Sequence, residues 1–340
     1  MTVTLVVLAC GASTTVQDGG RLGYLRFGLS GSGPIDHLAH AAANALVGNS
    51  SEAPAIEFGL CGGRFRVEGG SLRLALAGAP CPVSLDGELV AHHRSFVLRE
   101  GAELRIERPR TGVFATLALA GSMALTPEMG SVSLHRRAAL GGFDGRPLRD
   151  GDRISLTPQP ISGEADRALE PVAIDRERQI RVVLGPQQDR FTMRGVKTLL
   201  GSGFTVSNQA DRMGYQLDGP PIEHGEAGFN IVSDGTVAGS IQVPGSCRPI
   251  VLLADRQTTG GYPKIATVAS ADLRHLGQRR PGDAVRFAAI SLEEAVHLAR
   301  ERAAEVAALP SHLTPFLDAA DRLGAANLAG DAVDAFAAEP

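Results

Sequence analysis

The densest run of reactive side chains in the sequence lies near residue 260. It reads Thr258, Thr259, Gly260, Gly261, Tyr262, Pro263 and Lys264. Glycines let the backbone approach a ligand closely, and their amides can stabilise a developing oxyanion. Lys264 could bind a carboxylate or carbonyl oxygen, or protonate a departing nitrogen. The plainer alternative is a tight turn with a surface lysine. We predict catalytic roles for Lys264, Tyr262 and Asp255, and substrate binding for Thr258, Thr259, Gly260 and Gly261.

Other polar residues flank this run or stand in Gly-rich segments. Asp234 and Gln242 are predicted to bind substrate because they flank the densest motif. Asp211 and Arg212 are adjacent, so they form either an ion pair that fixes a loop or a carboxylate and guanidinium that face substrate.

The N-terminal segment holds a second polar group. Ser30 and Asn44 are predicted pocket donors. Asp18 and Arg21 lie in a Gly-rich turn, where a buried pair that holds the turn is the alternative to a site. Asp36 stands near the start of a predicted helix, where capping is the simpler account of a carboxylate.

Several well-known reaction motifs are absent. Neither lysine, Lys197 or Lys264, follows a glycine, so the chain has no Walker A phosphate loop. The G-x-S-x-G and H-E-x-x-H patterns are also missing. His37 and His40 could share a metal ion, but without a nearby carboxylate ligand no metal site is predicted. Neither lysine has the setting of a biotinylated lysine, so any biotin would be carried by another protein.

Short apolar runs bounded by glycine and proline predict a mainly β protein with a few helices. The predicted strands are Thr4–Leu8, Ser71–Ala77, Ser95–Leu98, Glu103–Glu107, Val113–Ala120, Arg181–Leu184, Gly203–Ser207, Ile250–Ala254 and Ala284–Ala288. This spacing is typical of barrels or sandwiches and argues against a doubly wound α/β fold.

Two segments have helical periodicity. Ile35–Val47 is Ala-rich and is followed by Gly48 as a stop signal. The capping box that begins at Ser291 opens a helix that is expected to run to Ala308. Residues 309–340 are expected to be a helical or mobile tail.

Proline and small polar residues between 157 and 180 predict a domain boundary. We therefore expect an N-terminal β-rich domain over residues 1–160 and a C-terminal β-barrel domain over residues 178–308 that carries the Lys264 motif.

Composition indicates a globular protein without a basic field. The formal net charge is −4, and 21% of the 340 residues are charged, so no nucleic acid partner is expected. The four cysteines are scattered, which favours the reducing cytoplasm over a disulfide framework. No apolar run approaches the roughly 20 residues of a membrane span.

Three ordered motifs carry a resemblance to a known family. They are Thr14 to Gly23 with Gly28 to Asp36 and Ala43 to Asn49; Asp211 to Tyr215; and Ser233 to Gly235 with Gly239 to Pro244 and Pro249 to Ala266. Together they closely resemble the allophanate hydrolase subunit 2 family of carboxyltransferase-like proteins, over about residues 10 to 295. One departure lies at Val132, where the family commonly has an arginine.

The resemblance implies a fold of two cyclophilin-like barrels and, as the leading function, the C subunit of an ATP-dependent 5-oxoprolinase. ATP would then be used by the complex, with no cofactor expected on this chain. The implied partners are a B-type protein of the allophanate hydrolase subunit 1 family and a lactam-activating protein of the A type. The alternatives are a urea or amide carboxyltransferase that uses biotin on a partner, and a non-catalytic antagonist of a kinase inhibitor.

Overall fold

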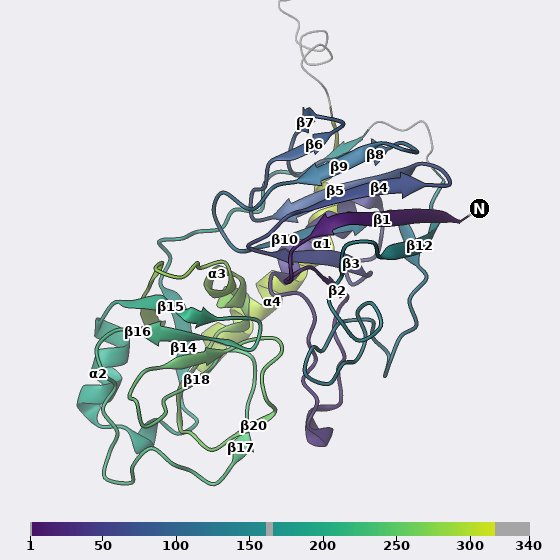
Figure 1. Cartoon of the computed structure of the whole chain (residues 1–340). Coiled ribbons are helices and arrows are strands. Elements are labelled where there is room, and N and C mark those ends of the chain that lie inside the picture. The colour runs from purple at the N-terminus through teal and green to yellow at the C-terminus, as the bar shows by residue number, and fades with distance from the viewer. Residues whose placement is uncertain (1, 161–165, 317–340) are drawn as a thin grey trace, which may run out of the picture.

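The computed structural model describes residues 2–160 and 166–316. Strands before residue 160 form two antiparallel sheets (Figure 1). The first has the order β11-β12-β1-β4-β9-β6-β7, and the second has the order β2-β3-β10-β5-β8. Their bounds are β1 Val3–Cys10, β2 Thr15–Gln17, β3 Ala55–Gly59, β4 Gly63–Glu68, β5 Leu72–Gly78, β6 Val83–Leu85, β7 Glu88–Val90, β8 Ser95–Leu98, β9 Glu103–Ile106, β10 Phe114–Leu119, β11 Gly121–Met123 and β12 Arg153–Pro158.

The two faces of β5 show why this half has a layered form. Leu74 and Leu76 belong to the core between the two sheets, whereas Ala75 and Ala77 pack against α1 (His37–Val47) on the other face. Side chains alternate between the faces of a strand, so small residues on one face let the helix approach closely.

Eight of the strands after residue 179 form one sheet in the order β22-β15-β16-β19-β18-β21-β14-β23. Their bounds are β14 Ile180–Leu184, β15 Phe204–Ala210, β16 Gly214–Asp218, β18 Ser240–Gln242, β19 Ile250–Leu252, β21 Lys264–Val268, β22 Ala284–Val285 and β23 Phe287–Ala289. The two edge strands are separated only by Arg286, so the chain carries one edge of the sheet to the other and nearly closes a barrel. The predicted mainly β fold with barrel-like sheets is confirmed.

The remaining elements are short strands and helices around these sheets. They are β13 Arg167–Ala168, β17 Asp234–Gly235, β20 Thr259–Gly260, β24 Thr314–Pro315, α2 Met193–Gly201, α3 Leu273–Gly277 and α4 Leu292–Ala308, with 3-10 turns η1 Leu25–Phe27, η2 Gln188–Arg190, η3 Ser270–Asp272 and η4 Leu309–His312.

The two predicted helices are confirmed with their caps. The backbone N–H of Ala39 donates to Asp36 at 3.0 Å at the start of α1, and Gly48 ends that helix in the left-handed conformation. The Ser291 hydroxyl accepts from the N–H of Glu294 at 3.1 Å at the start of α4. Of the predicted tail, η4 and β24 are described, and residues 317–340 lie outside the described residues.

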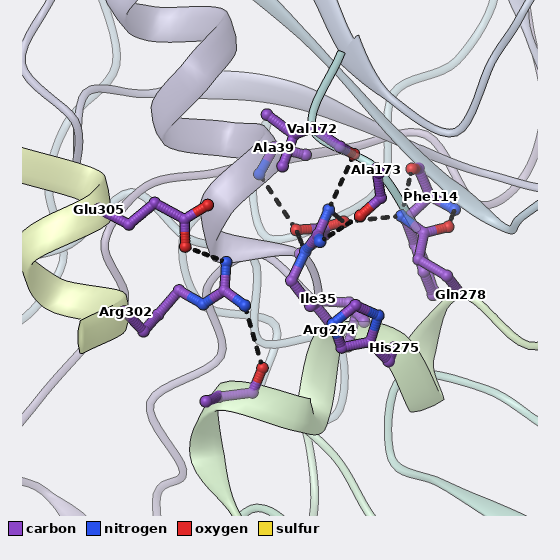
Figure 2. Close-up of polar contacts among 12 residues, drawn as sticks. Ile35, Ala39, Phe114, Val172, Ala173, Arg274, His275, Gln278, Arg302 and Glu305 are labelled. Atoms are coloured by element: carbon purple, nitrogen blue, oxygen red, sulfur yellow. Dashed lines mark hydrogen bonds and ion pairs between the residues drawn. The ribbon is translucent and has the colours of Figure 1, made fainter. Parts of the chain in front are cut away.

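The two halves meet at a buried ion pair between α1 and α3. The Arg274 guanidinium donates from Nε to Asp36 at 2.9 Å, and both side chains are almost fully buried. Arg274 also donates to the carbonyl of Ala173, in the segment that joins the halves (Figure 2). Asp36 therefore caps a helix of the first half and binds a cation of the second.

Gln278 extends the same contact. Its amide donates to Asp36 at 3.0 Å and to the carbonyl of Phe114 at 2.8 Å, while its oxygen accepts from the N–H groups of Val113 and Phe114 (Figure 2). The Gln278 amide thus makes the hydrogen bonds that the backbone of a neighbouring strand would otherwise make at the start of β10.

Candidate functional site

Lys264 opens β21 and lies in the C-terminal barrel with its side chain 2% exposed. Its Nζ donates to Oδ2 of Asp234 at 2.8 Å, and Nε2 of Gln187 donates to the same carboxylate oxygen at 2.9 Å. Hydrogen bonds from Lys264 and then Gln187 lower the pKa of Asp234. The Lys264 side chain is buried, whereas the Asp234 side chain that it binds is 52% exposed.

The predicted turn around Gly260 pairs with a segment more than twenty residues earlier in the chain. Thr259 and Gly260 in β20 lie antiparallel to Gly235 and Asp234 in β17, so this two-stranded ladder holds the aspartate opposite the glycine. A Cβ atom at Gly260 would lie 2.2 Å from the side-chain nitrogen of Gln242. A larger residue at this position would therefore displace the Gln242 amide from its present place.

Gln242, in β18 of the barrel, contacts the segment that contains this ladder. Its side-chain oxygen accepts from Nε2 of Gln257 at 3.0 Å, and its nitrogen lies 3.5 Å from the carbonyl of Tyr262. Tyr262 is 40% exposed, and the carbonyl of Thr258 accepts from the N–H of Thr236. The structure thus brings Lys264, Asp234, Gln242, Tyr262 and the 258–261 segment together into one partly exposed group, which we call the lysine cluster.

Arg212 forms a separate cluster where the two halves meet. Its guanidinium donates to both carboxylate oxygens of Asp255, at 2.9 and 3.1 Å, and to the carboxylate of Glu57 in β3. A further N–H donates to the carbonyl of Gly33 at 2.7 Å. Burial opposes the charge, but Asp255 and then Glu57 raise the pKa of Arg212. Burial raises the pKa of Glu57 despite this contact.

The structure argues against the ion-pair alternative at two places. Asp211 does not pair with Arg212: its carboxylate accepts from the N–H of Met213 at 2.7 Å and shapes the turn before β16. Asp18 and Arg21 likewise share no hydrogen bond. The neighbouring residue of opposite charge is the simplest partner in a sequence, but these groups bind backbone atoms and side chains that are distant in sequence.

A cavity of about 300 Å³ lies between the halves beside Arg212. Asp211, Arg212 and Asp255 line it, together with mostly apolar side chains such as Leu60 and Met213. The cavity is the clearest concave site near the predicted residues, but Lys264 is not among its lining residues. The residues predicted as one site therefore divide between the lysine cluster and this interdomain cavity.

Ser30 and Asn44 are held within the first half. The Ser30 hydroxyl lies 3.1 Å from Nε2 of His135, and both residues are buried. Asn44 is fully buried in α1, where it donates to the carbonyl of Ala53 and accepts from Asn49. Neither lines the interdomain cavity, and the contacts of Asn44 are those of a residue that fixes the loop after its helix.

The turn at Asp18 explains the departure at Val132. The Asp18 carboxylate accepts from the hydroxyls of Ser131 and Ser133 and from the N–H of Val132, and these bonds lower the pKa of Asp18 against the effect of burial. The Val132 side chain is 4% exposed and packs in the core between the sheets. The backbone N–H of Val132 thus binds the Asp18 carboxylate, while the Val132 side chain points into the core.

No metal site is apparent among residues 2–160 and 166–316, where no group of three or more His, Cys, Asp or Glu side chains could hold an ion. His37 is exposed, whereas His40 is 2% exposed and binds the carbonyl of Ala53. Within the same described ranges, no helix is long and apolar enough to cross a membrane.

Sequence reasoning missed Glu57 and Gln187. Glu57 lies in β3 between apolar neighbours, and a carboxylate inside such a strand is itself a signal of a buried cation partner. Gln187 lies in the loop after β14 and also accepts from the backbone of Lys264 at 3.0 Å. Nothing in its local sequence indicates that contact.

Relatives share this chain over most of its length. It is 37% identical to the C subunit of 5-oxoprolinase from Escherichia coli over 297 residues, which are 86% of this chain and 93% of that protein. It is 34% identical to the protein of the same name from Haemophilus influenzae, over 87% of this chain and 94% of that protein. The urea amidolyase of Lachancea kluyveri is 30% identical over 89% of this chain, which spans only 18% of that longer protein.

A solved structure and a family model agree with these relatives. The crystal structure of Kluyveromyces lactis urea carboxylase superposes with a TM-score of 0.81 and 26% identity, over 93% of this chain and 30% of that one. The family model for the carboxyltransferase domain, subdomain A and B, matches residues 27–289. The chain belongs to this carboxyltransferase domain family.

Proposed function

We propose that this chain is the C subunit of an ATP-dependent 5-oxoprolinase, which opens the lactam of 5-oxoproline to glutamate together with partner subunits. The observation that carries the proposal is the identity of 37% to the Escherichia coli protein across 93% of its length. The Haemophilus influenzae protein supports it over a similar span.

Ring opening of a lactam makes two chemical demands. The carbonyl carbon must be activated toward water, and the departing nitrogen must gain a proton. Without a phosphate loop in this chain, we assign ATP use to a partner subunit. The lysine cluster supplies a cationic donor in Lys264, whose Nζ is hydrogen-bonded to Asp234.

The position of the lysine cluster would suit a reaction at the interface with a partner protein. The Lys264 side chain is buried, but Asp234 and Tyr262 beside it are exposed, so an activated lactam on a partner could reach the edge of the cluster. The partners that we propose are a B-type protein of the allophanate hydrolase subunit 1 family and a lactam-activating protein of the A type.

The likeness to urea carboxylase favours one second candidate, carboxyl transfer from biotin carried by a partner. The fold is shared over 93% of this chain. The interdomain cavity of about 300 Å³ has apolar walls beside Arg212 that would suit a bicyclic group such as biotin. The test below separates the two candidates because only the first releases glutamate.

The test measures glutamate release from 5-oxoproline and ATP by this chain with its A-type and B-type partners. Lys264→Ala is expected to lower kcat at least about 100-fold, the scale of losing one acid-base group. Lys197→Ala is the matched control, because Lys197 is the other lysine of the sequence and is exposed on α2. A stable complex without activity would reject the oxoprolinase function, and an active Lys264→Ala complex would reject the site.

A further inference from the structure

A second cavity of about 200 Å³ lies between the loop before α1 and the segment that follows β19. In Figure 1 this loop, which includes η1, projects from the first half beside the C-terminal barrel. Most of its wall is apolar, with Leu22, Leu25, Ile35, Leu253 and Leu273 among the lining residues. Lys264 and Arg212 do not line it, so the cavity is distinct from both clusters described above.

Arg256 lines this cavity as a buried cation without a counter-charge. The residue is 8% exposed, its Nε has no acceptor, and its one hydrogen bond runs from Nη1 to the carbonyl of Leu253 at 3.5 Å. Burial lowers the pKa of Arg256, and no described carboxylate opposes that effect. The adjacent Asp255 is already bound to Arg212. An unpaired buried charge of this kind is costly.

Two more donors in the same wall lack acceptors. Arg21 is 1% exposed, and its Nη1 has no partner, although its other nitrogens donate to backbone carbonyls such as Glu128. The hydroxyl of Ser32 is also without a partner, and this residue has a φ of 55°. Strained backbone and unmet donors at one place are typical of sites that a ligand completes.

The wall chemistry selects the class of ligand. A phosphate dianion is bound by donors around all of its oxygens, whereas this cavity offers Arg256, one nitrogen of Arg21 and the Ser32 hydroxyl in a wall that is otherwise mostly apolar. A small organic acid with one carboxylate and an apolar body matches both features. We infer that this cavity binds such a carboxylate, with its charge on Arg256 and its carbon skeleton against the leucines.

The choice of acid rests on the proposed function. 5-Oxoproline carries one carboxylate on a small ring with methylene groups, so it fits the wall. Glutamate carries an additional ammonium, and no Asp or Glu lines the cavity to pair with that charge. We therefore expect 5-oxoproline to bind and glutamate to bind more weakly.

Isothermal titration of the full chain alone tests the site, without ATP or partner subunits. The probes are 5-oxoproline, glutamate and inorganic phosphate at one ionic strength. 5-Oxoproline is expected to bind with a stoichiometry of one, and Arg256→Met is expected to weaken it at least tenfold. Arg279→Met is the matched control, because Arg279 is 3% exposed and its Nε also lacks an acceptor, but it lines the interdomain cavity.

Thermal unfolding separates lost binding from lost folding. Removal of an uncompensated buried cation is expected to raise the melting temperature of Arg256→Met above that of the wild type. 5-Oxoproline is expected to raise the melting temperature of the wild type and of Arg279→Met, but not of Arg256→Met.

Four results would overturn the inference: no binding of 5-oxoproline to the wild type, equal binding to Arg256→Met, loss of binding in Arg279→Met, or tighter binding of phosphate. The proposed function fails independently of these. If the complex is inactive but this chain still binds 5-oxoproline, the proposed function is rejected and the binding site is supported. If the complex is active but this chain alone does not bind 5-oxoproline, the function is supported and the binding site is rejected.

Discussion

At the scale of single residues, Arg212 shows how strongly one side chain can depend on partners that are distant in sequence. Glu57 and Asp255 come from different halves, and both are nearly fully buried against its guanidinium. Two carboxylates can stay charged in a buried site only while a cation is bound between them. The Arg212 side chain is therefore needed to keep both carboxylates in place at the wall of the interdomain cavity.

Arg212→Met is expected to lower the free energy of unfolding by about 3–5 kcal/mol, because two carboxylates are left buried without a cation. Denaturant unfolding measures this loss. It should be smaller at pH 5 than at pH 8, since protonation of Glu57 relieves the unpaired charge.

The control is Arg248→Met, which removes an exposed ion pair with Asp218 and should cost at most about 1 kcal/mol. A loss in Arg212→Met no larger than that of the control, or one that is independent of pH, would contradict a role for the buried cluster.

The role of a residue could be predicted from the sequence where it depends on neighbouring residues in the chain. The cap at Asp36 follows from its place before an apolar helix, and the density of polar groups marked the Lys264 segment. The partners of Arg212 and of Lys264 lie 43 and 30 positions away, at Asp255 and Asp234. Strand register sets those contacts, and a single sequence does not display register.

At the scale of elements, α1 is a mostly apolar helix that buries an imidazole. His40 is 2% exposed, and burial lowers its pKa to about 4. The neutral ring binds the carbonyl of Ala53. A helix that is buried on nearly all sides can hold a histidine only in this uncharged form.

Acid is therefore expected to destabilise the protein through His40. The unfolded chain takes up this proton near its ordinary pKa of about 6.5, but the folded chain does so only near 4. The contribution of His40 to the free energy of unfolding is thus fully present above pH 6.5 and falls by about 3 kcal/mol as the pH drops from 6.5 to 4.

The free energy of unfolding, measured across this pH range, should decline less steeply in His40→Gln than in the wild type. His297→Gln, at an exposed position of α4, should keep the wild-type slope; if it flattens the curve equally, burial of His40 is not the cause.

Elements were predicted best where periodicity ran without interruption. The Ser95–Leu98 strand and the two long helices match the structure closely, whereas α2 and α3 were missed. Helix α2 begins at Thr192, whose hydroxyl accepts from the N–H of Gly195, but glycine within the helix weakens its pattern. Ala284–Ala288 was predicted as one strand, but it divides at Arg286 because barrel closure sends its two parts to opposite sheet edges.

At the scale of the whole molecule, the halves are joined by charge as well as by apolar packing. Asp36 of the first half binds Arg274 and Gln278 of the second, and Arg212 binds both halves. This explains how residues predicted for two separate domains line one cavity. The predicted boundary between residues 157 and 180 stays a prediction, because a boundary in folding requires a measurement of its own.

Asp36→Asn tests that union, because asparagine keeps the helix cap and removes the charge. It is expected to lower the free energy of unfolding by about 3–5 kcal/mol, since Arg274 is left buried without a counter-charge.

A double-mutant cycle measures the coupling between the two side chains. The double variant Asp36→Asn with Arg274→Gln should be at least about 2 kcal/mol more stable than the sum of the two single losses predicts. The exposed pair of Glu68 and Arg153 lies within the first half and should couple by at most about 1 kcal/mol. Calorimetry of Asp36→Asn should also separate one unfolding transition into two, because the halves lose one of the buried ion pairs that they share. Additive losses with a single transition would mean that this ion pair does not help to join the halves, and that Asp36 acts only as the cap of α1.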